Sequence, residues 1–529
     1  MNTSRVYGVV GITVWLLIIG LATVIRFYRL GDPFMWTDEA FSVLLSRHSP
    51  AFIWVHTAND VHPPFYYELL HYWMKLWGDS PFAVRSLSAV MGVAAVVLGI
   101  WLAELVANRK VAMWAGVMLA TLPIAVRYSQ EARMYALMAV LLFASTIALL
   151  YWVRQPSKYR LLWVYVVLIS ASFYTHYFTV MCVIAHWVYL GILSAHGTHR
   201  PSLIRRLAWW LANASIVVAY SPWLFTLWNR LSTSDVANQT GSMGWIAGAT
   251  IGTLPSAFWR ALMATSGNTL FELLYYVVPL VVFILAIRLL LRDRSQHQFP
   301  CALVIYTYVP LLVVFLVSLI LPMFMERYVF FALMGLPILI ALLLDRVRPN
   351  VLKGGVILVV VALEFVGLHT VYSQREDLDG SRNRQDFPFE EIASYVAQSS
   401  TPGDRMVVDG GLWYFSVLYY NQSSIMPQLH RDIDSGLGSS TILIPSAAQV
   451  YISDLAFIPH GNCRVWWLGR KGIDVMFPDS WQQLSERSMG TMDLRLYQTA
   501  SDPTGAGCPA PEPSNDTALR HRVKKIIAD

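Results

Sequence analysis

Residues 81–106 read PFAVRSLSAVMGVAAVVLGIWLAELV, and only Arg85 and Glu104 in this run are charged. About 20 apolar residues in a helix cross the roughly 30 Å of hydrocarbon in a bilayer, so the run predicts a transmembrane helix. Further apolar runs cover residues 8–25, 111–126, 135–153, 161–172, 178–193, 207–227, 269–287, 301–321, 328–344 and 354–370. The fold class that we predict is a polytopic α-helical membrane protein with about 11 transmembrane helices.

The composition agrees with that fold class. The 529 residues are 56% hydrophobic and 14% charged, with a mean hydropathy of +0.48, whereas soluble domains have about 25% charged residues. The run at 8–25 could instead be a cleaved signal peptide. No small-residue cleavage site follows it and further apolar runs do, so we expect a retained anchor.

Lysine and arginine are distributed unevenly between alternate loops. If the N-terminus is cytoplasmic, the cytoplasmic segments hold 15 basic residues in 50 positions and the outer segments hold 9 in 114. Because cytoplasmic loops carry the basic excess, we expect the first loop (26–80) and the C-terminal part on the outer side of the inner or plasma membrane. The net charge of +6 then reflects topology and contact with membrane lipids. It does not indicate nucleic acid as a partner.

A second domain is expected after the last apolar run, because the sequence becomes polar and charged from about residue 372. We predict a transmembrane domain at 1–371, a small extracytoplasmic α/β or α+β domain at 372–500 and a disordered tail at 501–529. Patterning in the small domain predicts helices at 390–398 and 480–487, and strands at 405–408, 440–444, 463–468 and 493–498. Its two cysteines, Cys463 and Cys508, are either free or joined in a disulfide.

Trp36-Thr37-Asp38-Glu39 lies about ten residues beyond the first apolar run. Carboxylates near a bilayer are costly unless they are hydrated, paired or used, so Asp38 and Glu39 are candidate catalytic residues. They begin an expected amphipathic helix that has apolar residues at positions 41, 44 and 45 on one face. The alternative is that Asp38 is the N-cap of this helix.

Two further outer segments carry groups that suit substrate binding. His62-Pro63-Pro64-Phe65-Tyr66-Tyr67 opens a second expected amphipathic helix. Arg127-Tyr128-Ser129-Gln130-Glu131-Ala132-Arg133-Met134-Tyr135 joins two apolar runs with more hydrogen-bonding groups than a turn requires. Arginine suits phosphate because its planar group offers paired donors. The alternative is that both arginines anchor at the interface while a Glu–Arg pair closes the loop.

Two more positions are candidates on the same outer side. His176 lies among aromatic residues in Phe173-Tyr174-Thr175-His176-Tyr177-Phe178, and Arg327 precedes the tenth apolar run in Glu326-Arg327-Tyr328. Arg327 could hold a lipid phosphate just above the hydrocarbon. An aromatic belt around the histidine and simple interfacial anchoring of the arginine are the alternatives.

These motifs in this order resemble the C-type (GT-C) integral membrane glycosyltransferases, and specifically glycosyltransferase family 39. The D-E pair, H-P-P-F-Y-Y, R-Y-S-Q-E-A-R-M-Y-A-L and a late E-R-Y are similar to motifs of protein O-mannosyltransferases and of the bacterial lipid A aminoarabinose transferase. The specific motifs cover 36–39, 62–67 and 127–137, whereas the architectural likeness covers roughly 8–370. Each motif alone is weak evidence, but together they are fairly specific.

The resemblance implies an enzyme that moves a sugar, with inversion, from a polyprenyl-phosphate donor to an extracytoplasmic acceptor of the lipid, glycan or protein class. It makes Asp38 the base on the acceptor side, with Glu39 as its neighbour, and places His62 in the H-P-P element. Arg133 and Arg327 become the candidates for the carrier phosphate. The remaining substrate-binding candidates are Tyr66, Arg127, Glu131, Tyr135 and His176.

The expected chemistry requires cations that stabilise the leaving phosphate and a carboxylate that accepts the proton of the acceptor hydroxyl. No cofactor is required, although a divalent cation held by Asp38 or Glu39 is an open alternative. No P-loop, dinucleotide fingerprint or Cys/His zinc spacing is present. Three other functions are alternatives: a transporter or flippase for a lipid-linked glycan, a glycan polymerase or ligase that uses a lipid-diphosphate donor, and a binding or sensor protein.

Overall fold

Two units make up the chain in the computed structural model. One consists of Met1–Asp32 and Ser49–Asn383, and the other of Pro33–His48 and Arg384–Asp529. The structure describes residues 3–58, 60, 62–195, 202–233, 246–266, 272–376, 378, 387–430, 451–452, 455, 458, 461–473 and 475–501. The division differs from the predicted boundary at 371/372. It also assigns part of the first outer loop to the C-terminal unit.

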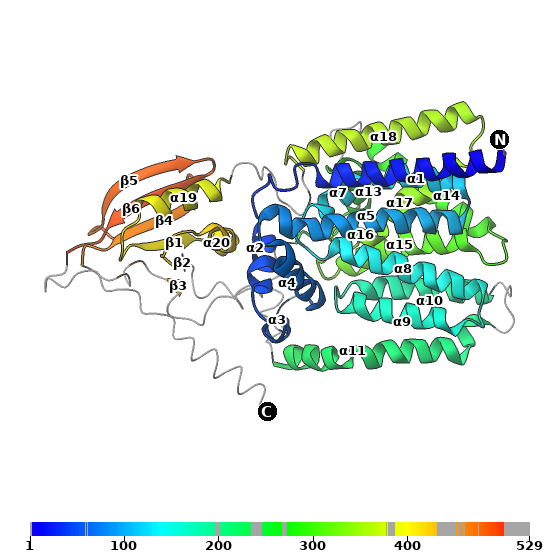
Figure 1. Cartoon of the computed structure of the whole chain (residues 1–529), viewed down its shortest axis with the longest axis horizontal. Helices are drawn as coiled ribbons and strands as arrows, with labels where there is room; N and C mark the ends of the chain where they lie inside the picture. The colour runs from blue at the N-terminus through cyan, green and yellow to red at the C-terminus, as the bar shows by residue number, and fades with distance from the viewer. Residues whose placement is uncertain are drawn as a thin grey trace. The chain divides into compact units, whose positions relative to one another are not determined.

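The first unit is helical (Figure 1). Its helices are α1 (Thr3–Phe27), α3 (Pro50–Thr57), α4 (Phe65–Trp77), α5 (Pro81–Val106), α6 (Arg109–Thr121), α7 (Pro123–Ser129), α8 (Tyr135–Arg154), α9 (Tyr159–Phe173), α10 (Thr179–Ala195), the 3₁₀ turn η1 (Leu203–Arg205), α11 (Leu207–Thr233), α13 (Thr253–Met263), α14 (Glu272–Arg292), α15 (Phe299–Ser318), α16 (Phe330–Leu333), α17 (Gly335–Leu344) and α18 (Asn350–Tyr372). In the described residues, each apolar run singled out in the sequence overlaps one or more helices. The runs at 111–126 and 328–344 are each divided into two helices.

Helix length and hydropathy together identify fewer membrane spans than the apolar runs predict. Among the described residues, six helices are long and apolar enough to cross a membrane, or seven if the bent pair α6 and α7 is one span. Four shorter apolar helices, Ile12–Phe27, Tyr159–Phe173, Thr179–Ala195 and Phe330–Leu344, fall below that length. The count of about 11 therefore stays a prediction.

Helix α8 forms the centre of the helical unit. It packs against α5 and α9, and nearly all of its side chains are buried, including Trp152. The outer helices α11, α14 and α18 expose large apolar side chains such as Phe225, Leu280 and Leu358. Apolar residues that face outward over whole helices are expected where lipid replaces water as the solvent.

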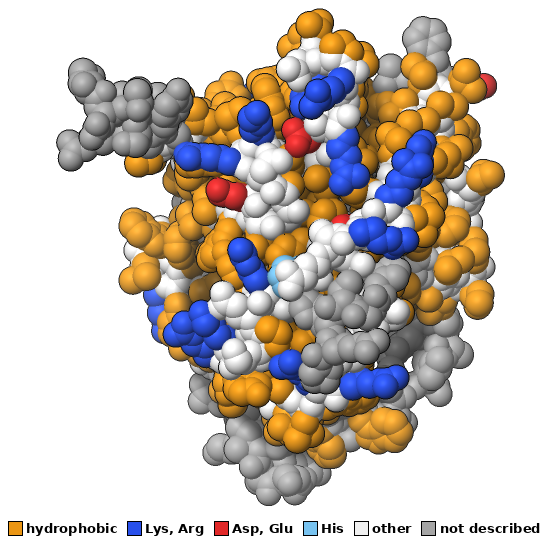
Figure 2. All heavy atoms as spheres, turned by 90° about the vertical axis from the view of Figure 1, so that its right-hand side faces the viewer, with side chains coloured by type: hydrophobic (Ala, Val, Ile, Leu, Met, Phe, Trp, Pro, Cys, Tyr) orange, Lys and Arg blue, Asp and Glu red, His pale blue; other side chains and the backbone are white. Residues whose placement is uncertain are grey.

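The basic segments of the sequence gather at one end of the helical unit. Successive long helices run in opposite directions, so the N-terminus and the connections α5–α6, α8–α9, α14–α15 and α17–α18 lie at the same end (Figure 1). Figure 2 shows this end with many lysine and arginine side chains and few acidic ones. The connections that the sequence assigned to one side of the membrane thus share one end of the fold.

At the other end of the unit, the chain is bent at a break between α6 and α7. The two helices are bent by 56° where Pro123 lacks an N–H and cannot bond to the carbonyl four residues earlier. The buried Arg26 on α1 instead donates to Leu119 O at 3.1 Å and to Ala120 O at 3.0 Å. This side chain satisfies carbonyls that a helix break would otherwise leave without partners.

Replacing Gly92 with alanine is expected to lower the free energy of unfolding by about 1–3 kcal/mol through overpacking. A Cβ atom at Gly92 on α5 would collide with Ser129 Oγ and lie 2.9 Å from Arg26 Nε. Ser129 cannot move easily, because it is buried and its Oγ donates to Ala125 O at 2.5 Å. Thermal melting of the purified protein in detergent measures the change.

Gly191→Ala is the matched control for that substitution. Gly191 lies inside α10, and no described atom comes within 4 Å of a Cβ atom built on it. Alanine there is expected to leave the melting temperature unchanged or to raise it slightly, because the unfolded chain loses entropy. Equal melting temperatures for the two variants would contradict the packing argument at Gly92.

The second unit is an α/β domain built on a six-stranded sheet in the order β3-β2-β1-β4-β6-β5. Strands β1 to β4 are parallel where they pair, and β6 runs antiparallel to both β4 and β5. The elements are α2 (Thr37–Ser46), α19 (Phe389–Ser399), β1 (Arg405–Asp409), α20 (Gly411–Tyr420), β2 (Pro427–His430), β3 (Tyr451–Ile452), β4 (Arg464–Arg470), β5 (Gln482–Met489) and β6 (Met492–Gln498). One face of the sheet buries Val407, Val465, Trp467 and Tyr497.

Most predictions for this domain are confirmed, and one is wrong. The helix at 390–398 and the strands at 405–408, 463–468 and 493–498 match α19, β1, β4 and β6. The segment at 480–487, for which the spacing predicts a helix, forms the edge strand β5, whose side chains are almost all exposed. Pairing with β6 overrides its helical spacing. The strand predicted at 440–444 lies outside the described residues.

The bonding states of three of the four cysteines can be compared with the predictions from the sequence. Cys182 and Cys301 are free and buried among the helices. Cys463 is disulfide-bonded. Its predicted partner, Cys508, lies outside the described residues.

Candidate active site

The loop between α7 and α8 is fixed by main-chain contacts. Arg133 N donates to Glu131 O at 2.7 Å, which turns the chain tightly. Ser88 Oγ on α5 donates to Arg133 O at 3.1 Å, and Tyr66 OH lies 3.0 Å from the same hydroxyl. One buried serine therefore ties together the H-P-P-F-Y-Y segment, helix α5 and the arginine-containing loop.

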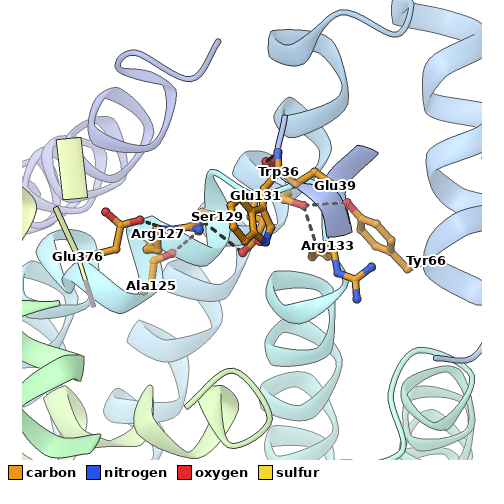
Figure 3. Close-up of polar contacts among 10 residues, drawn as sticks. Trp36, Glu39, Tyr66, Ala125, Arg127, Ser129, Glu131, Arg133 and Glu376 are labelled. Atoms are coloured by element: carbon orange, nitrogen blue, oxygen red, sulfur yellow. Dashed lines mark hydrogen bonds and ion pairs between the residues drawn. The ribbon is translucent and has the colours of Figure 1, made fainter. Parts of the chain in front are cut away.

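Arg127 is buried between two carboxylates. Its Nη1 lies 3.2 Å from Glu131 Oε2, and its Nε lies 2.8 Å from Glu376 Oε1. Figure 3 shows Arg127 beside Glu376. Removing one partner of a buried ion pair costs about 3–5 kcal/mol, because a charge is left without compensation. Arg127 and Glu131, both substrate-binding candidates, therefore have a structural role, since they join the α7–α8 loop to the segment after α18.

Arg133 lies at the centre of a buried polar cluster. Its Nη1 donates to Tyr67 OH at 3.3 Å, and its Nη2 is 3.4 Å from His62 Nδ1. Tyr67 OH in turn donates to Asp60 Oδ2 at 3.3 Å. Because arginine only donates hydrogen bonds, His62 accepts at Nδ1, so the neutral ring carries its proton on Nε2.

His176 extends this cluster from the loop between α9 and α10. Its ring centroid lies 5.4 Å from that of His62 and 6.0 Å from that of Tyr135. Phe178 N donates to His176 Nδ1 at 3.2 Å, so this ring also carries its proton on Nε2 when it is neutral. His176 Nε2 is buried and has no hydrogen-bond partner in the part of the chain that the structure describes. It is a donor available to a ligand.

The electrostatics keep both histidines uncharged. Burial, followed by the positive charge of Arg133 and Arg327, lowers the pKa of His176 to about 3. Burial also holds the pKa of His62 well below its usual value. The charges of Arg133, His176 and Arg327 lower it further, and their effects decrease in that order. The cluster thus presents arginines and neutral N–H donors, which suits an anion better than a proton-transfer step.

Arg327 also belongs to this cluster, whereas the adjacent Glu326 does not. Its guanidinium carbon lies 5.4 Å from the ring centroid of Tyr328, and that ring is 5.6 Å from His176. Glu326 instead lies 2.6 Å from Arg260 Nη1 on α13. Of these two adjacent charged residues, Glu326 therefore forms an ion pair with Arg260, whereas Arg327 belongs to the cluster.

Asp38 and Glu39 lie in the other unit, in the first turn of α2. The N-cap is Trp36, and Glu39 Oε2 accepts a hydrogen bond from Trp36 N at 3.3 Å. Asp38 is therefore not the N-cap, so the alternative drawn from the sequence is wrong, and Glu39 has the capping role. Both carboxylates still benefit from the partial positive charge at a helix N-terminus.

Helix α2 also differs from the amphipathic helix expected there. Ser42 and Ser46, which the pattern places opposite the apolar residues, are buried together with Phe41 and Leu45. Ser42 Oγ satisfies its hydrogen-bonding needs within the helix by donating to Asp38 O at 2.8 Å.

Among the described residues, no group of three or more His, Cys, Asp or Glu side chains could hold a metal ion. A cation bound by Asp38 and Glu39 would need further ligands, such as phosphate oxygens or water.

The sequence missed five residues of the site. Tyr67 and Ser88 bond to Arg133, Asp60 bonds to Tyr67, Glu376 pairs with Arg127, and Tyr328 lies between Arg327 and His176. Tyr67 and Tyr328 stand inside quoted motifs and could have been found there. Glu376 lies 249 positions from Arg127, and no local pattern connects the two.

The fold agrees with the family resemblance of the sequence motifs, because it is similar to the folds of two solved structures. The structure is similar to that of ArnT from Cupriavidus metallidurans bound to undecaprenyl phosphate, with a TM-score of 0.60, 12% identity, and coverage of 93% of this chain and 98% of that chain. It is also similar to the archaeal oligosaccharyltransferase AglB from Archaeoglobus fulgidus in complex with an inhibitory peptide and a dolichol-phosphate. That likeness has a TM-score of 0.51 and 11% identity, and it covers 80% of this chain and 65% of that chain.

Sequence comparison points in the same direction over part of the chain. Residues 61–226 match the family model for dolichyl-phosphate-mannose-protein mannosyltransferase. This segment contains the H-P-P-F-Y-Y motif, the α7–α8 loop and His176. No curated protein sequence matches the chain.

Proposed function

We propose that this protein is an integral membrane glycosyltransferase that moves a sugar from a polyprenyl-phosphate donor to an acceptor outside the cytoplasm, with inversion. The observation that carries the proposal is a cluster drawn from four separate segments, in which Arg133, His62 and His176 are buried and Arg327 is partly buried. Fixed cations and N–H donors stabilise a departing phosphate without transferring a proton to it. Structures with the same fold bind undecaprenyl phosphate and a dolichol-phosphate.

The proposed reaction divides its steps between named groups. Asp38 takes the proton from the acceptor hydroxyl while the acceptor oxygen bonds to the anomeric carbon. The bond between that carbon and the phosphate oxygen breaks, and the electron pair leaves with the polyprenyl phosphate. Arg133 and Arg327 hold that phosphate, while His62 and His176 donate from Nε2. Attack on the face opposite the leaving group inverts the anomeric centre.

A transfer assay with purified protein tests the proposal. The protein would be given one polyprenyl-phosphate sugar at a time together with a glycolipid, glycan or peptide acceptor. Release of polyprenyl phosphate together with a new glycoside supports the proposal. Movement of the intact donor across a vesicle without transfer would favour a flippase, and transfer only from a lipid diphosphate would favour a polymerase or ligase.

His176→Asn is expected to raise the KM for the donor about 10-fold, while His176→Gln raises it about 3-fold or less. A glutamine amide nitrogen reaches the position of the imidazole Nε2, whereas an asparagine amide lies near Nδ1, so only glutamine keeps a donor where the ligand needs one. The loss corresponds to one hydrogen bond to a charged group. Initial-rate kinetics at several donor concentrations measure both values.

His186→Gln is the control for replacing a buried histidine on the adjoining helix α10. His186 Nε2 lies 3.0 Å from Thr146 Oγ1 and its Nδ1 lies 3.2 Å from Tyr165 OH, within the protein interior. This substitution is expected to lower stability and to leave the donor KM unchanged. Equal donor KM values for His176→Asn and His176→Gln would argue against a donor role for His176.

The proposal places the site and the C-terminal unit outside the cytoplasm. Single cysteines at Lys75, Glu390 and Ser157, all exposed positions, test this topology in intact cells. Membrane-impermeant maleimide is expected to label the first two, and to label Ser157→Cys only after permeabilisation. Labelling at Ser157→Cys in intact cells would overturn the orientation.

A further inference from the structure

The segment that carries Asp38 belongs to the C-terminal unit, although it lies within the first hundred residues of the chain. Its main-chain path leaves the helical unit after Asp32 and returns to it at Ser49. Between these points, α2 packs against α20, which begins more than 360 positions later in the sequence. The structure thus assigns the proposed base and the proposed phosphate-binding cluster to different units.

Helix α20 contacts α2 along its whole length. At the N-terminus, Met35 N donates to Tyr420 OH at 3.0 Å, and the Trp36 ring lies 5.9 Å from that of Trp413, edge to face. One turn after Asp38, the Phe41 ring lies 5.5 Å from that of Phe415, again edge to face. At the C-terminus, the guanidinium carbon of Arg47 lies 5.6 Å from the ring centroid of Tyr419.

Contacts at three points along a helix fix its rotation as well as its position. The Cα atoms of an α-helix lie about 2.3 Å from its axis, so a rotation of about 25° moves each of them by about 1 Å. A carboxylate further from the axis moves more. Displacements of about 1 Å in a reacting group can cost about 10²-fold in rate.

We propose that the C-terminal unit is a positioning element for catalysis, in which α20 holds α2 and thereby aims Asp38 at the acceptor hydroxyl. The inference rests on the proposed function, in which Asp38 is the base. Trp413, Phe415 and Tyr420 are positioning residues that act through Asp38. The donor phosphate is held by the helical unit and does not depend on them.

The test compares kcat with the donor KM in the full-length protein. Phe415→Ala is expected to lower kcat about 10-fold, and Tyr420→Phe, which removes one hydroxyl, about 3-fold. The donor KM should change less than about 2-fold in both. Phe415→Leu, which retains apolar volume, should recover most of the lost kcat.

Phe477→Ala is the matched control in the same unit. The Phe477 ring stacks on Tyr497 at 4.2 Å and contacts Trp467, within the sheet core and not on α2. Its loss should lower the stability of the C-terminal unit without a matching loss of kcat at a temperature where the unit is folded. An equal fall in kcat for Phe477→Ala and Phe415→Ala would overturn the inference.

A double-mutant cycle with Asp38→Asn separates positioning from general damage. If α20 acts through Asp38, Phe415→Ala should cause less than about a 2-fold further loss once Asp38 is asparagine. A further loss of about 10-fold in that background would overturn the positioning role. Absence of sugar transfer by the wild-type protein would instead count against the proposed function, so the two failures are distinguishable.

Discussion

Asp38→Asn is expected to lower sugar transfer by about 10²-fold or more with the fold intact. Asparagine has nearly the size of aspartate but cannot accept the acceptor's proton. The helix cap does not depend on Asp38, because Glu39 accepts from Trp36 N at 3.3 Å. Turnover at saturating donor and acceptor, together with a thermal melt, measures the effect.

Asp32→Asn is the matched control for the change at Asp38. Asp32 lies six positions earlier and forms an exposed ion pair with Arg29 at 2.6 Å, which is worth little in stability or function. Transfer by Asp32→Asn should equal that of the wild type. Near-normal turnover by a well-folded Asp38→Asn protein would remove Asp38 from the role of base.

Arg133→Lys and Arg327→Lys are expected to weaken donor binding by about 1–3 kcal/mol each. Lysine keeps the charge but cannot reproduce two directed donors on one plane. At Arg133, the substitution also breaks the contacts to Tyr67 OH at 3.3 Å and His62 Nδ1 at 3.4 Å. Donor affinity from inhibition by a non-transferable polyprenyl-phosphate analogue reports the change, and the KM for the acceptor should change less.

Arg127→Lys provides the contrast within the same loop. Arg127 is committed to Glu131 and Glu376, so its replacement should lower the melting temperature and leave donor affinity near that of the wild type. Wild-type affinity in both Arg133→Lys and Arg327→Lys would remove these residues from the phosphate site. The next candidates would then be Arg127 and Arg260.

The helices of the first unit could be predicted because their signal is local. A run such as 81–106 is apolar on every side, so its hydropathy alone excludes a soluble segment. The same reasoning could not find the break at Pro123 or divide 328–344 into α16 and α17. Whether a proline ends a helix or bends it depends on whether other groups, here Arg26, satisfy the freed carbonyls.

The candidate site could be predicted in composition but not in arrangement. Arg133, His62 and His176 are all candidates from the sequence, and the structure brings them together. Arg127 and Arg133 look equivalent in the sequence, since both are arginines in one loop. Glu376 distinguishes them, because it engages Arg127 from 249 positions away.

The C-terminal unit shows the limit of local patterns most clearly. The segment at 480–487 has helical spacing but pairs with β6 as an edge strand, because hydrogen bonds to a neighbouring strand outweigh a weak local preference. The alternative that Asp38 is the N-cap of α2 was wrong for a related reason. Either Asp38 or Glu39 could cap a helix, and only the backbone shows that it begins after Trp36.

Charge, hydropathy and short motifs are local properties of the chain, so they were enough to predict the membrane class, the approximate positions of the helices, the acidic pair and the basic and histidine candidates. Three findings came from the packing of distant segments and could not be predicted: 33–48 packs with 411–420, Arg127 is used in ion pairs, and His176 keeps a buried donor. These outcomes depend on which distant segments pack against one another. A local sequence does not specify its partner, because many different segments could bury its apolar side chains and pair with its polar groups equally well.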